Sequence, residues 1–162
     1  MKTNENFQLS TFNFQPDKRL AVVILNWNGR ALMEEFLPSV VACTPGEWAD
    51  VIVADNGSTD DSIEMLKTKF PTVGIIRLDK NYGFAEGYNQ ALKHIGHEYT
   101  VLLNSDVEVT PGWLDAPIAA LDADKFAGMT GEEKLPYALG GVVVAGLLYL
   151  VLALLFKLVG AK

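Results

Sequence analysis

The sequence predicts an α/β domain with a mostly parallel sheet and helices on both of its faces. Short apolar runs rich in β-branched residues alternate with helical segments along the chain, which is the order typical of a parallel sheet. The runs are continuously apolar, as strands covered on both faces require. Small polar or acidic residues follow each run, and right-handed crossovers bring all of these strand ends to one edge of the sheet.

Four strands and three connecting helices are expected. The first strand is the β-branched run Ala21–Leu25, and the next three are Asp50–Asp55, Val73–Leu78 and Tyr99–Asn104. The helical segments between them cover about Arg30–Val41, Asp60–Phe70 and Phe84–Ile95. A further helix is expected to start near Trp113, whose ring is more simply explained by packing than by stacking on a sugar.

A polar loop follows each of the four strands. These loops contain Asn26-Trp27-Asn28-Gly29, Asp55-Asn56-Gly57-Ser58-Thr59-Asp60, Asn81-Tyr82-Gly83-Phe84 and Asn104-Ser105-Asp106. One such loop is ordinary turn chemistry, but four at the edge where open α/β sheets bind ligands predict a polar ligand site. No GxGxxG motif and no P-loop is present, which disfavours hydride transfer and P-loop phosphoryl transfer.

Three of the loops suggest local chemistry. Ser58 or Thr59 is expected to cap the second helix, which leaves Asp55 to face a ligand. Gly83 permits a tight turn whose exposed amides can hold a phosphate, although a simple glycine-started helix has the same pattern. Asp106, with Asn104 beside it, suits a hard divalent cation that also binds phosphate oxygens.

The charges divide the chain at Lys134. Of 13 Lys and Arg residues only Lys157 and Lys162 lie beyond it, so the first 134 residues carry 11 basic and 20 acidic groups, a net charge of −9. That acidic part has the length of one domain, and it lacks the basic patches on which nucleic-acid binding depends. The single cysteine, Cys43, indicates a reducing compartment, and the N-terminus has no signal-peptide pattern.

The uncharged run from Leu135 to Phe156 has no polar face. Its 22 residues would extend about 33 Å as a helix, enough to cross a bilayer. The sequence therefore predicts a polar leader over residues 1–18, a domain over 19–130 and a single-pass transmembrane helix over 135–158. A buried core helix is the alternative for the apolar run. The lysines at its C-terminal end favour a cytoplasmic C-terminus, but a tail anchor with the domain in the cytoplasm is topologically simpler and is preferred.

The segments VVILNWNGR, VIVADNGSTDDS, LDKNYGFAEGYNQAL and YTVLLNSDVEVTPGWL, in this order, strongly resemble the family 2 glycosyltransferases. The resemblance is greatest to the rhamnosyltransferase-like branch and runs from about Leu20 to Leu121. It implies a GT-A-type, Rossmann-like fold that binds a nucleotide-diphosphate sugar, with Mg²⁺ or Mn²⁺ as cofactor. The implied partners are this donor, a saccharide or lipid-linked acceptor and the membrane, and no nucleic acid.

The resemblance also implies roles for single residues. Asn26, Trp27 and Asn28 would lie along the nucleotide base, and Asp55 would accept a hydrogen bond from it. Asn81, Gly83 and Asn89 would help to hold the ribose-diphosphate. Asn104-Ser105-Asp106 stands where the family has its DxD motif, so that Asp106 binds the metal and Asn104 replaces the first aspartate.

The family's acceptor half and its general base, an Asp in an ED-type motif, have no counterpart in this sequence. None of the later acidic residues is predicted to be the base; these are Asp115, Asp122, Asp124, Glu132 and Glu133. The fold is therefore expected to be truncated, with a tail that is atypical for the family. Three hypotheses follow: an inverting glycosyltransferase of polysaccharide or cell-wall assembly, a catalytically incomplete nucleotide-binding module or fusion remnant, and a membrane interaction element.

Overall fold

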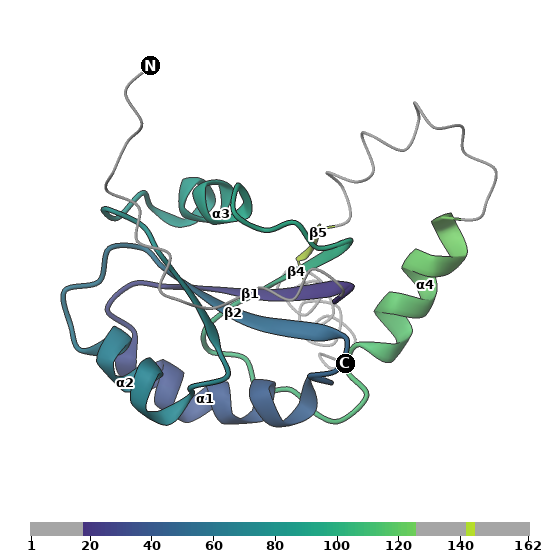
Figure 1. Ribbon diagram of the computed structural model, residues 1–162, viewed down its shortest axis with the longest axis horizontal. Helices are drawn as coiled ribbons and strands as arrows, with labels where there is room; N and C mark the ends of the chain where they lie inside the picture. Colours follow the sequence, from purple (N-terminus) through teal and green to yellow (C-terminus); the bar gives the residue numbers. More distant parts are fainter. Residues whose placement is uncertain (1–17, 126–141, 145–162) are drawn as a thin grey trace, which may run out of the picture.

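The protein is seen here in a computed structural model that describes residues 18–125 and 142–144 (Figure 1). Along the chain, the strands are β1 (Leu20–Asn26), β2 (Ala49–Asp55), β3 (Gly74–Arg77), β4 (Tyr99–Leu103) and β5 (Val142–Val144). The helices are α1 (Arg30–Cys43), α2 (Ser62–Lys69), α3 (Phe84–Leu92) and α4 (Asp115–Lys125). The expected alternation of strands and helices is confirmed.

The sheet has the strand order β3-β2-β1-β4-β5, and all four described pairings are parallel. The chain thus moves outward from β1 to β3 and then crosses back to place β4 on the other side of β1. This reversal makes the boundary between β1 and β4 the topological switch point, the place where open α/β sheets form a crevice.

The two faces of the sheet carry separate cores, because successive side chains of a strand point to opposite faces. Alternate residues of β1, such as Val22 and Ile24, pack with Met33 and Leu37 of α1 on one face. Val23, on the other face, belongs to the cluster that contains Tyr88 and Ala91 of α3. Figure 1 shows α1 and α2 on one side of the sheet and α3 on the other.

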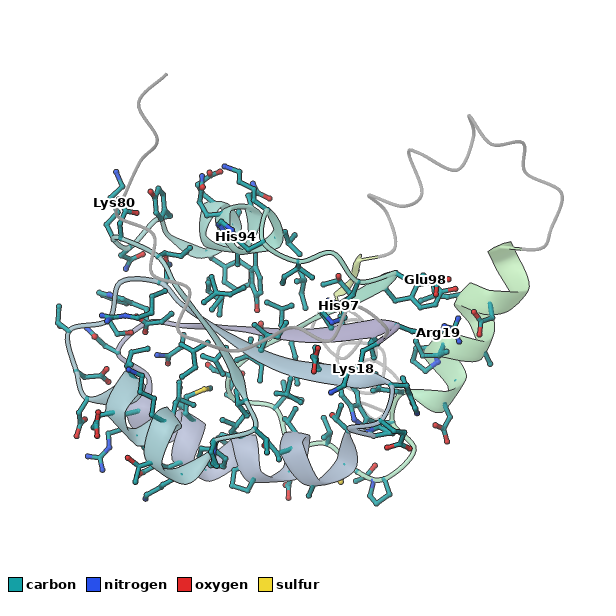
Figure 2. The ribbon with its side chains drawn as sticks, viewed as in Figure 1. Lys18, Arg19, Lys80, His94, His97 and Glu98 are labelled. Atoms are coloured by element: carbon teal, nitrogen blue, oxygen red, sulfur yellow. The ribbon has the colours of Figure 1, made fainter. Side chains whose placement is uncertain are left out.

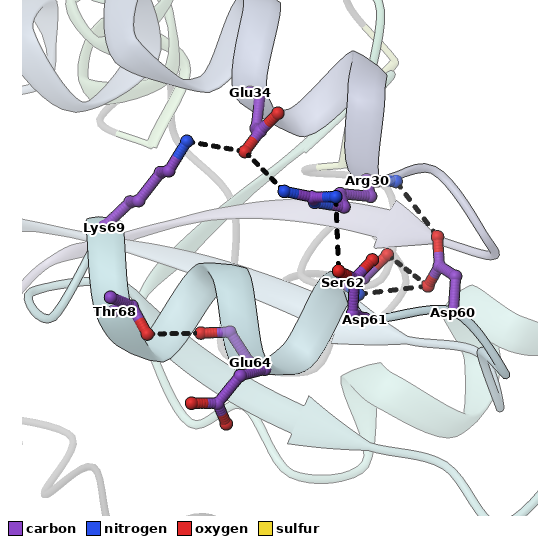
Figure 3. Close-up of polar contacts among 8 residues, drawn as sticks. All are labelled: Arg30, Glu34, Asp60, Asp61, Ser62, Glu64, Thr68 and Lys69. Carbon is purple, nitrogen blue, oxygen red and sulfur yellow. Dashed lines mark hydrogen bonds and ion pairs between the residues drawn. The ribbon is translucent and has the colours of Figure 1, made fainter.

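Helices α1 and α2 are joined at the surface by ion pairs (Figure 3). The carboxylate of Glu34 accepts hydrogen bonds from Lys69 at 2.6 Å and from Arg30 at 3.3 Å. The Lys69 bond is the main reason why the pKa of Glu34 lies below its ordinary value. Exposed pairs of this kind contribute little stability singly, so the apolar residues beneath them hold these helices.

Helix α2 begins two residues later than expected, and its predicted cap is wrong. Asp60 accepts hydrogen bonds at Oδ1 from the amide of Ser62 at 3.1 Å and from its hydroxyl at 2.5 Å. Burial acts against ionisation of Asp60, but the bonds from Ser62 and from the Arg30 amide lower its pKa overall. An acidic side chain at a helix N-terminus is favoured by the helix dipole, so Asp60 does what Ser58 or Thr59 was expected to do.

The edge of the sheet opposite the polar loops holds a buried ionic cluster. Asp50 is 2% exposed, and its Oδ1 accepts a hydrogen bond from Lys18 at 2.7 Å, while its other oxygen lies 3.0 Å from Nε2 of His97. A histidine on a short polar segment such as this one is expected at the surface, but the side chain of His97 is only 5% exposed. Figure 2 shows Lys18 and His97 together near the start of β1, with Lys80 at the far end of the sheet.

Helix α4 is attached to the same edge by Asp122. Its carboxylate accepts hydrogen bonds from Arg19 at 2.7 Å and from the Tyr99 hydroxyl at 2.8 Å, and the Arg19 guanidinium lies over the Tyr99 ring. Trp113, at the approach to α4, packs against the core as expected. Burial and the bond to Asp122 together raise the pKa of Tyr99 to about 12.

This tyrosine makes the stability of the protein sensitive to alkali. Its pKa in the folded state, about 12, exceeds the ordinary value of about 10, so the folded state holds the phenolic proton more tightly. Its contribution is therefore complete below about pH 10 and is lost as the pH rises toward 12. We expect the last tyrosinate transition in an ultraviolet titration to vanish in Tyr99→Phe. A titration unchanged by this substitution would contradict the assignment.

Most of the predicted transmembrane segment, 135–158, lies outside the described residues, as does the predicted leader except for Lys18. Val142–Val144 do not continue a helix: they form β5 and pair with Thr100–Leu102 of β4. Three consecutive β-branched residues suit a strand better than a helix, and β4 offers them an edge to pair with. Among the residues described, no helix has the length and apolar character that crossing a membrane requires. The membrane location stays a prediction.

Candidate functional site

The four polar loops meet at the carboxyl edge of the sheet, as the sequence predicts. The loop after β1 and the loop after β2 are bonded directly to each other. Asn26 is buried at the end of β1, and its Nδ2 donates to Asp55 Oδ1 and to Ser58 Oγ, each at 3.2 Å. Below these contacts, the backbone amide of Asn56 donates to the carbonyl of Asn26 at 2.7 Å.

Asn28 holds the two loops together further out from the sheet. It has a φ of +50°, a left-handed conformation that asparagine adopts more readily than most residues. In this conformation its Oδ1 accepts a hydrogen bond from the Thr59 amide at 2.7 Å, and its own amide donates to Ser58 Oγ at 2.9 Å. The side chain of Asn28 is thereby engaged in building the loop, whereas Trp27 beside it is 57% exposed.

Asp55 is placed differently from the expectation that it faces a ligand freely. It is fully buried, and its second oxygen accepts a hydrogen bond from the amide of Ser58 at 3.2 Å. A carboxylate withdrawn from water is held by such bonds, and those come from Asn26 and Ser58. The contact between Asp55 and the nucleotide base stays a prediction, and in the structure the carboxylate of Asp55 joins the β1 and β2 loops.

Asn56 links the β2 loop to the loop after β3. Its Nδ2 donates to Asn81 Oδ1 at 3.0 Å and to the Gly83 carbonyl at 2.9 Å, while its Oδ1 accepts from the Tyr82 amide at 2.9 Å. Asn81 also accepts the amide of Gly83 at 2.7 Å. Asn56 was not singled out from the sequence, yet it makes most of the contacts between these loops. Its position in an Asn-Gly turn is the sequence feature that could have indicated a structural role.

Gly57 allows this contact between loops. It has a φ of +71°, and a Cβ added there would lie 2.5 Å from the backbone carbon of Lys80. We expect Gly57→Ala to lower the free energy of unfolding by more than about 2 kcal/mol, since the left-handed conformation alone costs an alanine about 1–2 kcal/mol. Gly96→Ala is the control, because a Cβ there meets nothing within 4 Å and the backbone φ is not positive. Equal stability of the two variants in denaturant melts would contradict this explanation.

Helix α3 starts at the same edge, directly after Gly83. No side chain caps its first turn, and uncapped amides at a helix N-terminus favour an anion. Close approach of the helix to the sheet depends on Gly87, where a Cβ would lie 3.0 Å from Leu25 and from Asn56. Asn89 is on the exposed side of the helix and donates to Glu86 at 3.3 Å. It is therefore not joined to the loop network by any contact described.

Asn104 and Asp106 lie in the turn after β4, on the other side of the switch point. Both are exposed, and within residues 18–125 and 142–144 Asp106 has no hydrogen bond or ion pair. Among those residues, no three His, Cys, Asp or Glu side chains form a metal-binding group. One exposed carboxylate fits the way in which Mg²⁺ is usually bound, by one or two carboxylates with water and substrate phosphates completing the shell.

Fold and site together define an open parallel α/β domain whose polar loops gather beside its topological switch point. Residues 21–132 match the family "Glycosyl transferase family 2". The chain belongs to this family.

Sequence relatives agree with this assignment. The chain is 27% identical over 123 residues to N-acetylglucosaminyl-diphospho-decaprenol L-rhamnosyltransferase of Mycobacterium tuberculosis, a match that covers 69% of this chain and 40% of that protein. It is also 27% identical over 115 residues to undecaprenyl-phosphate 4-deoxy-4-formamido-L-arabinose transferase of Klebsiella pneumoniae, covering 67% of this chain and 35% of the relative. The chain thus spans two fifths or less of the length of these relatives.

Solved structures share the fold. TarS residues 1–349 of S. aureus, in complex with UDP-GlcNAc, align with a TM-score of 0.58 and 23% identity over 65% of this chain and 31% of that one. The mannosyltransferase PcManGT of Pyrobaculum calidifontis, in complex with GDP-Man and Mn²⁺, aligns with a TM-score of 0.54 and 21% identity over 71% of this chain and 35% of that one. The GT-A-type fold implied by the sequence is therefore supported.

Proposed function

We propose that this chain binds the nucleoside-diphosphate part of a nucleotide sugar at the carboxyl edge of its sheet, as the donor-binding part of a glycosyltransferase. The observation that carries the proposal is the assembly of four loops at the switch point between β1 and β4. Membership of the family supports it, as do relatives described as sugar transferases. We place its biological role in polysaccharide or cell-wall assembly with a saccharide or lipid-linked acceptor.

The two sides of the switch point suit the two parts of such a ligand. Trp27, at the β1 end, offers an exposed aromatic face against which a nucleobase can stack. At the same edge of the sheet, the uncapped start of α3 and the exposed carboxylate of Asp106 would provide for a diphosphate and its cation. The cation, Mg²⁺ or Mn²⁺, would offset the negative charge that develops on the departing nucleoside diphosphate.

Asp106 would hold this cation, and the loop residues would orient the donor. We assign no general base to any described residue. The activity that we propose for this chain is therefore binding of the donor, and sugar transfer is the activity of the family. The second candidate is a nucleotide-binding module that does not transfer sugar. The loop assembly accounts for donor binding alone, and no described residue is assigned as a general base.

Isothermal titration calorimetry with UDP, dTDP and GDP, each with and without Mn²⁺, tests the proposal. We expect binding of at least one nucleoside diphosphate that Mn²⁺ strengthens, and inorganic phosphate serves as the control ligand. Absence of binding by all three nucleotides would overturn the proposal. Incubation with UDP-, dTDP- and GDP-sugars then separates the two candidates, because release or transfer of sugar identifies an enzyme and its absence identifies a binding module.

A further inference from the structure

A tyrosine hydroxyl is inserted between the two central strands at the switch point. Tyr88 belongs to α3, is 4% exposed and projects into the sheet next to Gly87. Its hydroxyl donates to the carbonyl of Leu103 at 3.0 Å and accepts a hydrogen bond from the amide of Leu25 at 3.3 Å. These two backbone groups belong to neighbouring strands, β4 and β1, so that one side chain contacts both.

The insertion comes where the pairing of the strands stops. The register of β1 with β4 runs from Leu20 opposite Tyr99 to Ile24 opposite Leu103 and goes no further, whereas β1 stays paired with β2 up to Asn26. Leu25 is the first residue of β1 past this point, and its amide is bonded to the tyrosine. The Tyr88 hydroxyl thus takes the place of a direct bond between the strands and separates their ends.

The two backbone groups also stand immediately before the predicted ligand-binding segments. Leu25 precedes Asn26-Trp27-Asn28, and Leu103 precedes Asn104-Ser105-Asp106. Any movement of one strand end against the other would change the distance between the base side and the metal side of the site. A single hydroxyl bonded to both strand ends sets that distance.

We propose that Tyr88 is a positioning residue that couples the nucleotide side of the site to its metal side. The inference deepens the function proposed above and rests on it for the identity of the ligand. Without the hydroxyl, the ring still packs in the core and against Phe84, but the Leu25 amide and the Leu103 carbonyl lose their shared partner. The ends of β1 and β4 then move independently, and a cation at Asp106 no longer strengthens the binding of a nucleotide held beside β1.

The test compares Tyr88→Phe with Tyr99→Phe in the full chain. Each variant loses one hydroxyl; Tyr99 lies at the start of β4, where its hydroxyl is bonded to Asp122 at the opposite edge. The first measurement is amide hydrogen exchange without ligand. We expect Tyr88→Phe to speed exchange about tenfold or more both at residues 25–28 and at 103–108, since losing a buried partner costs enough for that change. Tyr99→Phe should leave both segments unchanged.

The second measurement is the factor by which Mn²⁺ strengthens the binding of UDP or GDP. We expect this factor to fall about tenfold in Tyr88→Phe, while the affinity without metal stays within about twofold of that of the unmodified chain. An exchange increase limited to residues 25–28, or equal in the two variants, would overturn the inference. So would an unchanged Mn²⁺ factor. If the unmodified chain binds no nucleotide, the proposed function fails, and hydrogen exchange still decides whether Tyr88 couples the two strand ends.

Discussion

Asp106→Asn is expected to remove the metal-dependent part of nucleotide binding and to leave the fold intact. Asp106 is exposed in the turn after β4 and contacts no other described residue through a hydrogen bond or an ion pair. Substitution at such a surface position changes the free energy of unfolding by about 0.5 kcal/mol or less. The amide of asparagine keeps the size of the side chain but not the negative charge that a hard cation requires.

We expect a loss of about 10- to 100-fold in affinity for a nucleoside diphosphate when Mn²⁺ is present. Substituting even a residue that only hydrogen-bonds to a metal ligand weakens metal binding by that much. Affinity without metal should be unchanged. Calorimetry with and without Mn²⁺ measures both values. Glu108→Gln is the matched control, since Glu108 is exposed two residues further along the same loop. An equal loss in both variants, or none in Asp106→Asn, would contradict the assignment of Asp106.

Asn56→Ala is expected to destabilise the protein and to weaken nucleotide binding at the same time. The substitution removes the three side-chain hydrogen bonds that join the β2 loop to Asn81, Tyr82 and Gly83. A typical hydrogen bond contributes about 1 kcal/mol net, and a buried group left without a partner costs more. The expected decrease in the free energy of unfolding is therefore about 3 kcal/mol, measured from the denaturant midpoint at constant m-value.

Two further variants test whether the hydrogen bonds that the Asn56 amide group donates cause the loss of stability. Asn56→Asp keeps an acceptor for the Tyr82 amide but places carboxylate oxygens against Asn81 Oδ1 and the Gly83 carbonyl. It should destabilise at least as much as alanine at neutral pH, because like partial charges then face each other in a buried site. Asn89→Ala, on the exposed side of α3, should change stability by about 0.5 kcal/mol or less. A stable Asn56→Asp variant would contradict this explanation.

The arrangement of the sheet followed from local patterns in the sequence. Runs such as AVVIL and the VIVA within DVIVAD are apolar and rich in β-branched residues, and the structure places them in β1 and β2 of a parallel sheet. The ends of elements were less predictable. Helix α3 stops at Leu92 rather than continuing to Ile95, and α2 starts at Ser62 because Asp60 binds its amide. The ends of these helices depend on individual hydrogen bonds, which a hydropathy pattern does not reveal.

Several polar residues that the sequence suggests are exposed are buried by the fold. Asp55 is of a residue type that usually faces water, and His97 is of a type with intermediate burial. No local pattern marks either residue as buried. Each is withdrawn from solvent because a partner distant in the sequence is present: Asn26 for Asp55 and Asp50 for His97. The same holds for Val142–Val144, whose strand conformation depends on the edge that β4 presents.

The sequence by itself determined the family, the parallel α/β sheet and the edge at which its polar loops collect, because all three depend on composition and order along the chain. The tertiary structure alone decided which polar residues build the site and which remain exposed to a ligand. Asn56 and Tyr88 acquire their roles from backbone groups on other elements. Asp106 keeps its exposed carboxylate because no described neighbour pairs with it. Hydrogen-bond partners are set by distance in space, and the sequence order does not record that distance.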